Sequence, residues 1–221
     1  MSQEIVSLDG PSGAGKSTIA KLLAKNLSFK YLDTGAMYRA VTLYFIDNNI
    51  DINNEVQVLN ALDNINIKFD TNNKVYLNDK DVTDKIRESN VVSLVSKVAS
   101  LSVVRENMVR LQRLITKDEY YVVDGRDIGS VVLPNARYKF YIDASVDERA
   151  MRRYKEEISK GKNITFEEVR DSIQARDEYD STRKDSPLVI PDNATVVDST
   201  NMTIDEVVKR VTDVIFNIRA L

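Results

Sequence analysis

Residues 10–17 read Gly-Pro-Ser-Gly-Ala-Gly-Lys-Ser and fit the pattern G-x-x-x-x-G-K-[ST] in full. The residues before them, EIVSLD (4–9), form a short apolar run typical of a buried strand, and the run after them, STIAKLLAKNL, has the apolar spacing of a helix. Glycines let a backbone wrap around phosphates with its N–H groups pointing inward, and the positive N-terminal end of the helix faces the same anion. This stretch therefore predicts a strand, a phosphate-binding loop and a helix.

Within the loop, two side chains have expected roles in binding a nucleoside triphosphate. Lys16 is expected to reach the β- and γ-phosphate oxygens, and the Ser17 hydroxyl is expected to ligate Mg²⁺. The motif alone indicates nucleotide binding, because GTPases, ATPases and kinases share it. The guanine-reading element Asn/Thr-Lys-x-Asp is not matched by TKDE at 116–119. Motor ATPases need larger architectures, so the sequence favours a kinase of small molecules.

The rest of the chain alternates strand and helix patterns, with one interruption. Further strands are predicted at 29–33, 119–124, 138–143 and 195–198. Residues 65–82 instead alternate with period two and carry Asn/Asp turns, which indicates a small antiparallel meander. We expect an α/β fold in which a P-loop NTPase-type parallel sheet is flanked by helices and a small antiparallel β insertion interrupts the alternation.

Capping signals place several helices along this alternation. Residues 90–117 read as two helical pieces broken near 100–102, and 122–134 (VVDGRDIGSVVLP) read as a strand end followed by a loop. Ser145 can cap a charged helix that reaches about Lys160, and Thr165 with Glu168 forms a capping box for the next helix, expected to reach about Asp180. A terminal helix is predicted from Thr203 to Leu221.

Composition limits the class of protein. A chain of 221 residues suits one sizeable α/β domain with an insertion. No apolar run approaches the roughly 20 residues that cross a bilayer, and the first residues lack a signal-peptide pattern. Cysteine is absent, so we expect a cytoplasmic location. The net charge of −3 gives no reason to expect nucleic acid as a partner.

The absence of histidine bears on the chemistry. Any mechanism must work without the commonest general base. A phosphate monoester has its second pKa near ~6 and is largely a dianion at neutral pH, so it needs no base to act as a nucleophile. The composition agrees with a nucleoside monophosphate as acceptor, although a carboxylate base acting on a hydroxyl acceptor stays open.

Most of the arginines lie between Arg105 and Arg183, and several fall at helical or strand-end spacing. Residues 149, 152 and 153 are spaced to share one helix face, as are 176, 180 and 183 if that helix persists. Arg39 follows the second strand and Arg126 follows the strand ending at Asp124, and strand-end loops are where open α/β sheets bind ligands. These positions favour phosphate clamps. The alternative is a salt-bridged surface, in which acidic neighbours pair with the arginines at 149–153: Asp147, Glu148, Glu156 and Glu157.

Seven motifs together resemble the bacterial cytidylate kinases, which are P-loop nucleoside monophosphate kinases. In order they are GPSGAGKS (10–17), DTGAMYR (33–39), VVDGRDIGSVVLP (122–134), FYIDAS (140–145), RDEYDSTR (176–183), SPLV (186–189) and VVDST (196–200). The resemblance covers essentially the whole chain, including the antiparallel insertion. It implies Mg²⁺-dependent transfer of the γ-phosphoryl group of ATP to CMP or dCMP by a cytoplasmic monomer.

The resemblance also implies an organisation of the chain. The core would comprise about 1–60 and 97–221, the insertion that binds the nucleoside monophosphate about 60–96, and a helical lid about 147–180. Two alternatives remain: another P-loop kinase, for thymidylate, adenylate or shikimate, and an ATP-binding regulatory module without turnover.

Site residues follow from the resemblance at matching positions. The ATP-binding residues would be Gly10, Pro11, Ser12, Gly13, Ala14, Gly15, Lys16, Ser17, Thr18, Arg149 and Arg152. The catalytic residues would be Lys16, Arg126, Arg153, Arg176 and Arg183. The substrate-binding residues would be Thr34, Arg39, Ser96, Arg105, Asp127 and Asp180. Mg²⁺ would be held by Ser17 and, through a water molecule, by Asp124.

The substrate-binding set divides by the part of CMP that each residue would contact. Ser96, Arg105 and Asp127 would read the cytosine edge, where an amino donor lies beside two acceptors, so that a carboxylate plus a cation prefers cytosine to uracil. Asp180 would meet the ribose hydroxyls, and Arg39 would join the catalytic arginines in holding the acceptor phosphate. Ser96 could instead bond within its own helix, and Asp127 could pair with Arg126 or cap its loop.

Overall fold

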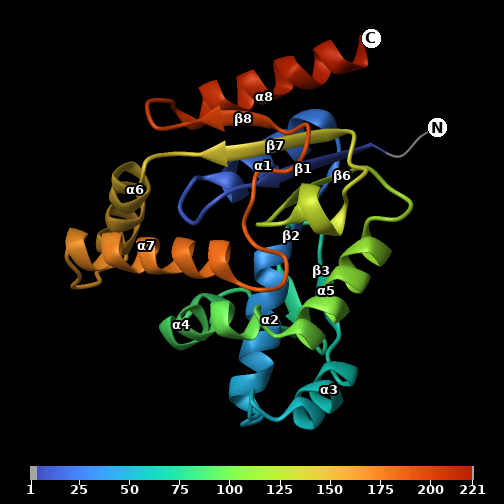
Figure 1. The fold of residues 1–221 in the computed structure, drawn as a ribbon, viewed down its shortest axis with the longest axis vertical. Coiled ribbons are helices and arrows are strands. Elements are labelled where there is room, and N and C mark those ends of the chain that lie inside the picture. The colour runs from blue at the N-terminus through green and yellow to red at the C-terminus, as the bar shows by residue number, and fades with distance from the viewer. Residues whose placement is uncertain (1–3, 221) are drawn as a thin grey trace. The chain divides into compact units, whose positions relative to one another are not determined.

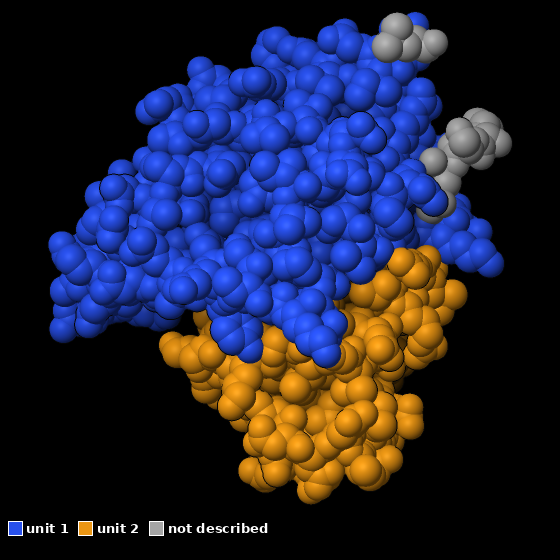
Figure 2. Space-filling view, viewed as in Figure 1, with its two compact units in different colours: residues 1–32, 116–221 blue, residues 33–115 orange. Residues whose placement is uncertain are grey.

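The computed structural model describes residues 4–220 and divides the chain into two compact units. Unit 1 comprises residues 1–32 and 116–221, and unit 2 comprises residues 33–115 (Figure 2). Leu221, the predicted end of the terminal helix, lies outside the described residues.

Unit 1 is built on a parallel sheet in the order β2-β6-β1-β7-β8 (Figure 1). The strands are β1 (Ile5–Asp9), β2 (Lys30–Asp33), β6 (Tyr121–Asp124), β7 (Tyr138–Asp143) and β8 (Thr195–Asp198). The central strand β1 pairs in parallel with β6 on one side and with β7 on the other. Strands buried on both faces read as continuous apolar runs, which is why EIVSLD and YKFYID were recognisable in the sequence.

Helices cover this sheet and supply its core. Helices α1 (Lys16–Leu27) and α8 (Ile204–Arg219) pack against each other. Ile19 and Leu23 of α1 and Val211 of α8 are fully buried, and they form one apolar cluster with strand residues such as Phe140. The predicted strands, the terminal helix and the α/β class are confirmed.

The charged helices α6 (Val146–Ser159) and α7 (Phe166–Thr182) form a pair with a separate small apolar cluster. Ala150 of α6 and Val169 and Ile173 of α7 make up its buried part. The predicted caps are confirmed: Ser145 accepts a bond from the amide of Glu148, and Thr165 begins α7 in a capping box.

One prediction for unit 1 was wrong. The segment after β6 was expected to be a loop, whereas Ile128–Val132 form a π-helical turn, labelled η2. The carbonyl of Asp127 accepts the amides of both Val131 and Val132, at 2.9 and 3.0 Å. The second of these bonds spans five residues, which is the spacing of a π-helix, and such turns are frequent at functional sites.

Unit 2 contains the predicted antiparallel meander and most of the middle helices. Its elements are α2 (Thr34–Asp47), α3 (Glu55–Asp63), β3 (Ile67–Phe69), β4 (Val75–Leu77), β5 (Lys80–Asp81), the 3-10 turn η1 (Lys85–Arg87), α4 (Ser89–Val98) and α5 (Ser102–Ile115). Strands β3, β4 and β5 pair antiparallel in that order, and the predicted break between two helices falls between α4 and α5. Helix α2 packs against α4, and α3 packs against α5.

No helix within residues 4–220 combines the length and the apolar character that a membrane span requires.

Candidate functional site

The glycine-rich loop joins the end of β1 to the start of α1, as its motif requires. Gly10 leaves β1 with φ +143°, and a Cβ there would lie 2.0 Å from the carbonyl oxygen of Ile142, so that only glycine fits. Lys16 is the first residue of α1 and is 6% exposed. Its amine donates to the carbonyl of Pro11 at 2.6 Å, which folds the side chain back over the loop.

The amine of Lys16 lies in an unusual electrostatic setting. Burial, together with the nearby guanidinium of Arg126, lowers the pKa of Lys16 well below its usual value, while Asp124 and Asp9 raise it. A phosphate anion beside the amine would favour the charged form and raise this pKa again. The loop therefore holds a cation whose charge is stabilised when an anion arrives.

Beside the loop, one carboxylate accepts hydrogen bonds from two hydroxyl groups. Asp124 ends β6, the strand next to β1, and is 4% exposed. The hydroxyl of Ser17 donates to its Oδ2 at 2.6 Å, and the hydroxyl of Tyr31 donates to its Oδ1 at 3.1 Å. Mg²⁺ prefers oxygen ligands and keeps several water molecules, taking few protein ligands besides substrate phosphates. The hydroxyl and carboxylate of this pair fit such an ion.

Five of the predicted site residues lie close together at the end of α7, where Asp180 is 4% exposed. Arg126 Nε donates to Asp180 Oδ2 at 3.0 Å, and Arg176 and Arg183 approach the same carboxylate to 4.0 and 3.8 Å. Arg183 Nη2 also lies 4.0 Å from Oδ1 of the buried Asp127. Three guanidinium groups thus face two carboxylates, an arrangement with surplus positive charge that suits a phosphate.

The predicted helical spacing of residues 176, 180 and 183 does not extend to Arg183. Helix α7 ends at Thr182, and Arg183 is its cap residue in an extended conformation. Its Nε donates to the carbonyl of Ser186 at 2.6 Å. Arg183 therefore contacts Asp180 from the segment that begins directly after the helix.

The three arginines of α6 have different partners, although their helix is as predicted. Arg149 is 4% exposed and donates to the carbonyl of Ser12 at 3.0 Å and to Oδ2 of Asp177 at 2.5 Å. Arg152 contacts Glu148 and Ser199. Only one of the three contacts the phosphate loop.

The outermost arginine of α6 has the surface environment that the alternative interpretation described. Arg153 pairs with Glu156 at 3.0 Å and with Glu157 at 2.8 Å, and its side chain is 38% exposed. Asp147, the fourth acidic neighbour considered, pairs instead with Arg170 of α7.

Two carboxylates close to the predicted site were missed by sequence reasoning. Asp9, the last residue of β1, accepts the amides of Ile128 and Gly129 at 2.6 and 2.7 Å. Asp177 Oδ1 accepts the amide of Ser12 at 3.4 Å while its other oxygen holds Arg149. An acid directly before the glycine loop was a usable signal for Asp9. No local pattern marks Asp177, because its partners lie far away in the sequence.

Unit 2 carries the remaining predicted residues. Arg39 was expected in a strand-end loop and instead lies on α2, which begins at Thr34. The Asp33 side chain caps this helix by accepting the amide of Ala36 at 2.7 Å, and its other oxygen accepts from Arg39 at 3.2 Å. Thr34 is 3% exposed. The cap therefore also orients the arginine.

Arg105 and Ser96 lie on the helices after the meander. Arg105 lies in the first turns of α5, is 3% exposed, donates to the carbonyl of Ala99 at 3.1 Å, and sits 5.5 Å from the ring centre of Tyr38. Ser96 is half-buried on α4.

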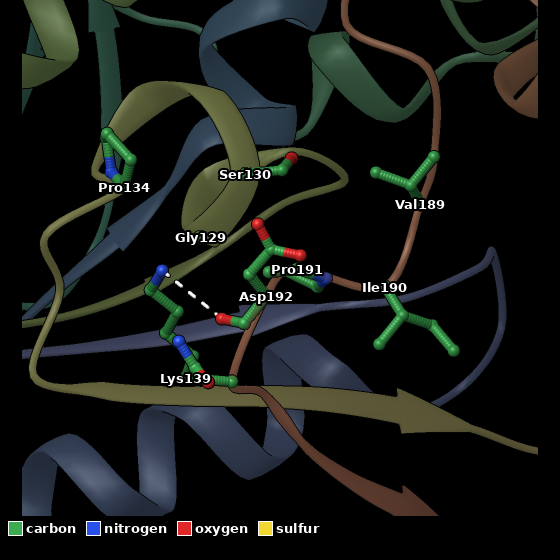
Figure 3. Close-up of a pocket in the computed structure, with 9 residues that line it drawn as sticks. Gly129, Ser130, Pro134, Lys139, Val189, Ile190, Pro191 and Asp192 are labelled. Carbon is green, nitrogen blue, oxygen red and sulfur yellow. Dashed lines mark hydrogen bonds between the residues drawn. The ribbon is translucent and has the colours of Figure 1, made fainter.

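A separate pocket of about 360 Å³ opens beside the π-helical turn (Figure 3). It is lined by Gly129 and Ser130 of the turn, by Lys139 of β7 and by the segment 189–193 before β8. The amine of Lys139 donates to the carbonyl of Asp192 at 3.4 Å. None of the predicted site residues lines this pocket.

Comparison with known proteins adds an independent finding. Residues 6–217 match the family model described as cytidylate kinase. The chain is 51% identical over 208 residues to a cytidylate kinase of Fusobacterium nucleatum, covering 94% of this chain and 95% of the relative. It is 48% identical over 211 residues to a cytidylate kinase of Clostridioides difficile, covering 96% and 97%.

Solved structures show the same fold at low sequence identity. A shikimate kinase from Bacteroides thetaiotaomicron aligns over 97% of this chain and 99% of its own, with a TM-score of 0.53 and 14% identity.

Proposed function

Because the chain belongs to the cytidylate kinase family, we propose that it transfers the γ-phosphoryl group of ATP to CMP or dCMP, giving ADP and CDP or dCDP. The observation that carries the proposal is the pairing, within unit 1, of a complete phosphate loop with the cluster of Arg126, Arg176 and Arg183 around Asp180. A triphosphate and a monophosphate both need their charge neutralised before they can approach each other, and this unit offers cations for both.

The phosphate loop would bind the triphosphate. The backbone amides of residues 10–18 would surround its oxygens, and Lys16 would leave the carbonyl of Pro11 to reach them. Arg149 is already fixed against the loop at Ser12, and the side chain of Arg152 donates to the carbonyl of Ser199, directly after β8, so both are suited to hold ATP. Ser17 and, through water, Asp124 would hold Mg²⁺, which would neutralise charge on the phosphates.

The arginine cluster would bind the acceptor phosphate and the group in transfer. An oxygen of the CMP phosphate, already a dianion in large part, would attack the γ-phosphorus while the bond to the bridging oxygen of ADP breaks. No side chain has to remove a proton, which agrees with a chain that contains no histidine. Arg126, Arg176 and Arg183 would exchange part of their contact with Asp180 for the phosphate oxygens, and Arg153 would leave its surface pairs for the γ-phosphate.

Four of the predicted residues are assigned to the base and the ribose. We propose that Asp127 and Arg105, each at most 4% exposed, contact the cytosine edge together with Ser96, and that Asp180 contacts the ribose. Burial of a carboxylate and a guanidinium supports such readout, since a buried polar group left unpaired by the wrong base is costly. Thr34 and Arg39 on α2 are the other proposed substrate-binding residues, and Arg39 would contact the acceptor phosphate.

The domain roles are likewise proposals. The helical pair at about 147–180 would act as a lid over ATP, the insertion at about 60–96 would bind the monophosphate, and the core would comprise about 1–60 and 97–221. The small apolar cluster of Ala150, Val169 and Ile173 supports the lid role, because it lets α6 and α7 move as one body. We further propose a cytoplasmic monomer whose partners are ATP and CMP or dCMP, with neither nucleic acid nor membrane.

The test is an acceptor panel in one coupled assay. Purified protein with Mg-ATP is offered CMP, dCMP, UMP, AMP and shikimate, and ADP is measured. We expect turnover with CMP and dCMP well above that with the others. Turnover with shikimate, or with AMP above CMP, would replace the assignment by another P-loop kinase. No ADP with any acceptor would favour a regulatory ATP-binding module.

A further inference from the structure

Asp9 connects two parts of unit 1 that the proposed function treats separately. Its backbone continues directly into Gly10 of the phosphate loop, so its position is tied to the site that would bind ATP. Its carboxylate turns to the other side of the strand end and accepts the amides of Ile128 and Gly129 at 2.6 and 2.7 Å. The side chain is fully buried.

The π-helical turn is held tightly against β1 at this point. A Cβ on Gly129 would lie 2.9 Å from Oγ of Ser7, 3.1 Å from Oδ2 of Asp9 and 3.1 Å from Cγ of Pro191. Contacts this short mean that a Cβ at position 129 would have to displace these neighbours or the turn itself. Figure 3 shows Gly129 and Pro191 at the edge of the neighbouring pocket.

The docked turn in turn fixes the residues immediately before it. The carbonyl of Asp127 accepts two amides of the turn, which holds the backbone of Asp127 in place. Arg126 and Asp127 then extend toward Asp180 and Arg183. A displacement of the turn would therefore carry both side chains with it.

We propose that Asp9 is a positioning residue that sets the Arg126–Asp127 pair in register with the phosphate loop. This inference rests on the proposed function, which assigns the acceptor phosphate to Arg126 and the base to Asp127. The end of β1 then connects the two binding sites. Its backbone continues into the phosphate loop that would bind ATP, and the carboxylate of Asp9 holds the turn that follows Arg126 and Asp127.

The chemistry of the contact calls for a carboxylate. The amide of Ile128 bonds to Oδ1 of Asp9 and the amide of Gly129 bonds to Oδ2, so an asparagine in the same orientation would turn an NH₂ donor toward one of the two amides. Burial raises the pKa of Asp9 to about 6, against the two amide bonds that lower it; Asp127 raises it further and Lys16 lowers it. The fold thus retains a buried carboxylate at some expense in stability, which is typical of residues kept for function.

The experiment compares Asp9→Asn with Asp143→Asn. Asp143 ends the neighbouring strand β7, and its carboxylate accepts a local hydrogen bond, from the amide of the next residue, Ala144, at 2.8 Å. KM and kcat are measured for CMP and for UMP at saturating ATP, and KM for ATP at saturating CMP, with folding checked by circular dichroism. For Asp9→Asn we expect kcat/KM for CMP to fall at least ~10-fold, mainly through KM, with the CMP-to-UMP preference narrowed and KM for ATP within about twofold of wild type. Asp143→Asn should match wild type.

A second variant guards against a folding defect. Gly129→Ala leaves the carboxylate in place but pushes the turn away from β1, so it should give the same selective loss for CMP. Unchanged CMP constants in both variants, or a kcat lowered equally for all substrates with every KM unchanged, would overturn the positioning role. A wild-type protein that does not phosphorylate CMP would overturn the proposed function and this inference together, whereas active wild type with unaffected variants would overturn this inference alone.

Discussion

The phosphate loop and the helical pair α6–α7 both carry residues proposed to bind phosphate, yet they are built in different ways. The loop is one run of eight residues whose conformation is fixed by glycines and by the start of α1. The helical pair instead presents long side chains whose charges are already matched by carboxylates of the same chain, as in Arg149 with Asp177 and Arg153 with Glu157.

This difference has a consequence for ligand binding. Backbone amides of the loop need little rearrangement to receive an anion, because their direction is set by the fold. The arginines of α6 must first give up ion pairs, and how much this costs depends on burial. The comparison therefore predicts large functional effects and small stability effects at the loop, and a graded mixture along α6.

The largest effect is expected at Lys16. Lys16→Ala removes the cation that would follow the transferring phosphoryl group, and loss of one such preorganised group costs at least ~10²–10³-fold in kcat. The fold should persist, because within residues 4–220 the hydrogen bond of this amine goes to a loop carbonyl, that of Pro11. A coupled assay measures the loss of kcat, and thermal unfolding measures the stability of the fold. Lys25→Ala, an exposed lysine on the same helix, is the control, and equal rates for the two variants would contradict the assignment of the loop.

At the entrance to the loop, the expected effect is a pH dependence of stability. The pKa of Asp9 is raised in the folded state to about 6 from an ordinary 3.8. A carboxyl group with a raised folded pKa contributes stability that is fully present below pH 3.8 and is lost as the pH rises through about 6. The difference of about two pKa units corresponds to roughly 3 kcal/mol.

Denaturant unfolding of wild type and Asp9→Asn at pH 4 and pH 7.5 measures this effect. Raising the pH should lower the free energy of unfolding of wild type relative to the variant by up to roughly 3 kcal/mol. A difference that does not change with pH would show that Asp9 ionises normally.

A smaller stability effect is expected at the inner end of α6. Arg149→Ala breaks a largely buried ion pair and leaves Asp177, whose side chain is 19% exposed, without its close cation. Loss of one partner of a fully buried pair costs ~3–5 kcal/mol, and partial exposure of Asp177 reduces this to about 2 kcal/mol. Urea unfolding measures the loss. The double variant Arg149→Ala, Asp177→Ala removes both charges and should recover part of the lost stability. If it were no more stable than Arg149→Ala alone, the unpaired carboxylate of Asp177 would not be the cause of the loss.

The smallest stability effect is expected at the outer end of the same helix. Arg153→Ala removes an arginine that is 38% exposed. Its buried partner Glu157 keeps a second cation, Lys162, so the free energy of unfolding should change by less than ~1 kcal/mol. If Arg153 leaves these pairs to contact the γ-phosphate, kcat should nevertheless fall clearly. The variant separates the two interpretations of this arginine, because a purely surface role would leave both quantities near wild type.

The order of strands and helices could be predicted from the sequence because its signals are local. Buried strands read as apolar runs, Ser145 and Thr165 mark helix starts, and the glycine loop joins a strand to a helix. The π-helical turn escaped because its defining bonds, from Val131 and Val132 to Asp127, leave no periodic pattern over so few residues.

The contacts of the site were harder to predict than its members. Asp127 and Asp180 were identified, but that Arg126 pairs with Asp180 depends on how segments 54 residues apart meet. Arg149 and Arg153 are indistinguishable by spacing, and the packing of α6 against α7 and against the phosphate loop buries one and leaves the other exposed. Asp177 was overlooked for the same reason, whereas Asp9 had a local signal in its place directly before the glycine loop.

Gly10 has a consequence for any attempt to diversify this protein. With an oxygen of β7 only 2.0 Å from where a Cβ would stand, a saturation library at this position should return a single residue under selection for growth or for binding. Recoding the neighbouring codons, or grafting the whole strand and loop together, would then be the workable routes to a changed nucleotide preference. The segment that can be transferred to another protein is therefore the strand together with its loop, and not the loop by itself.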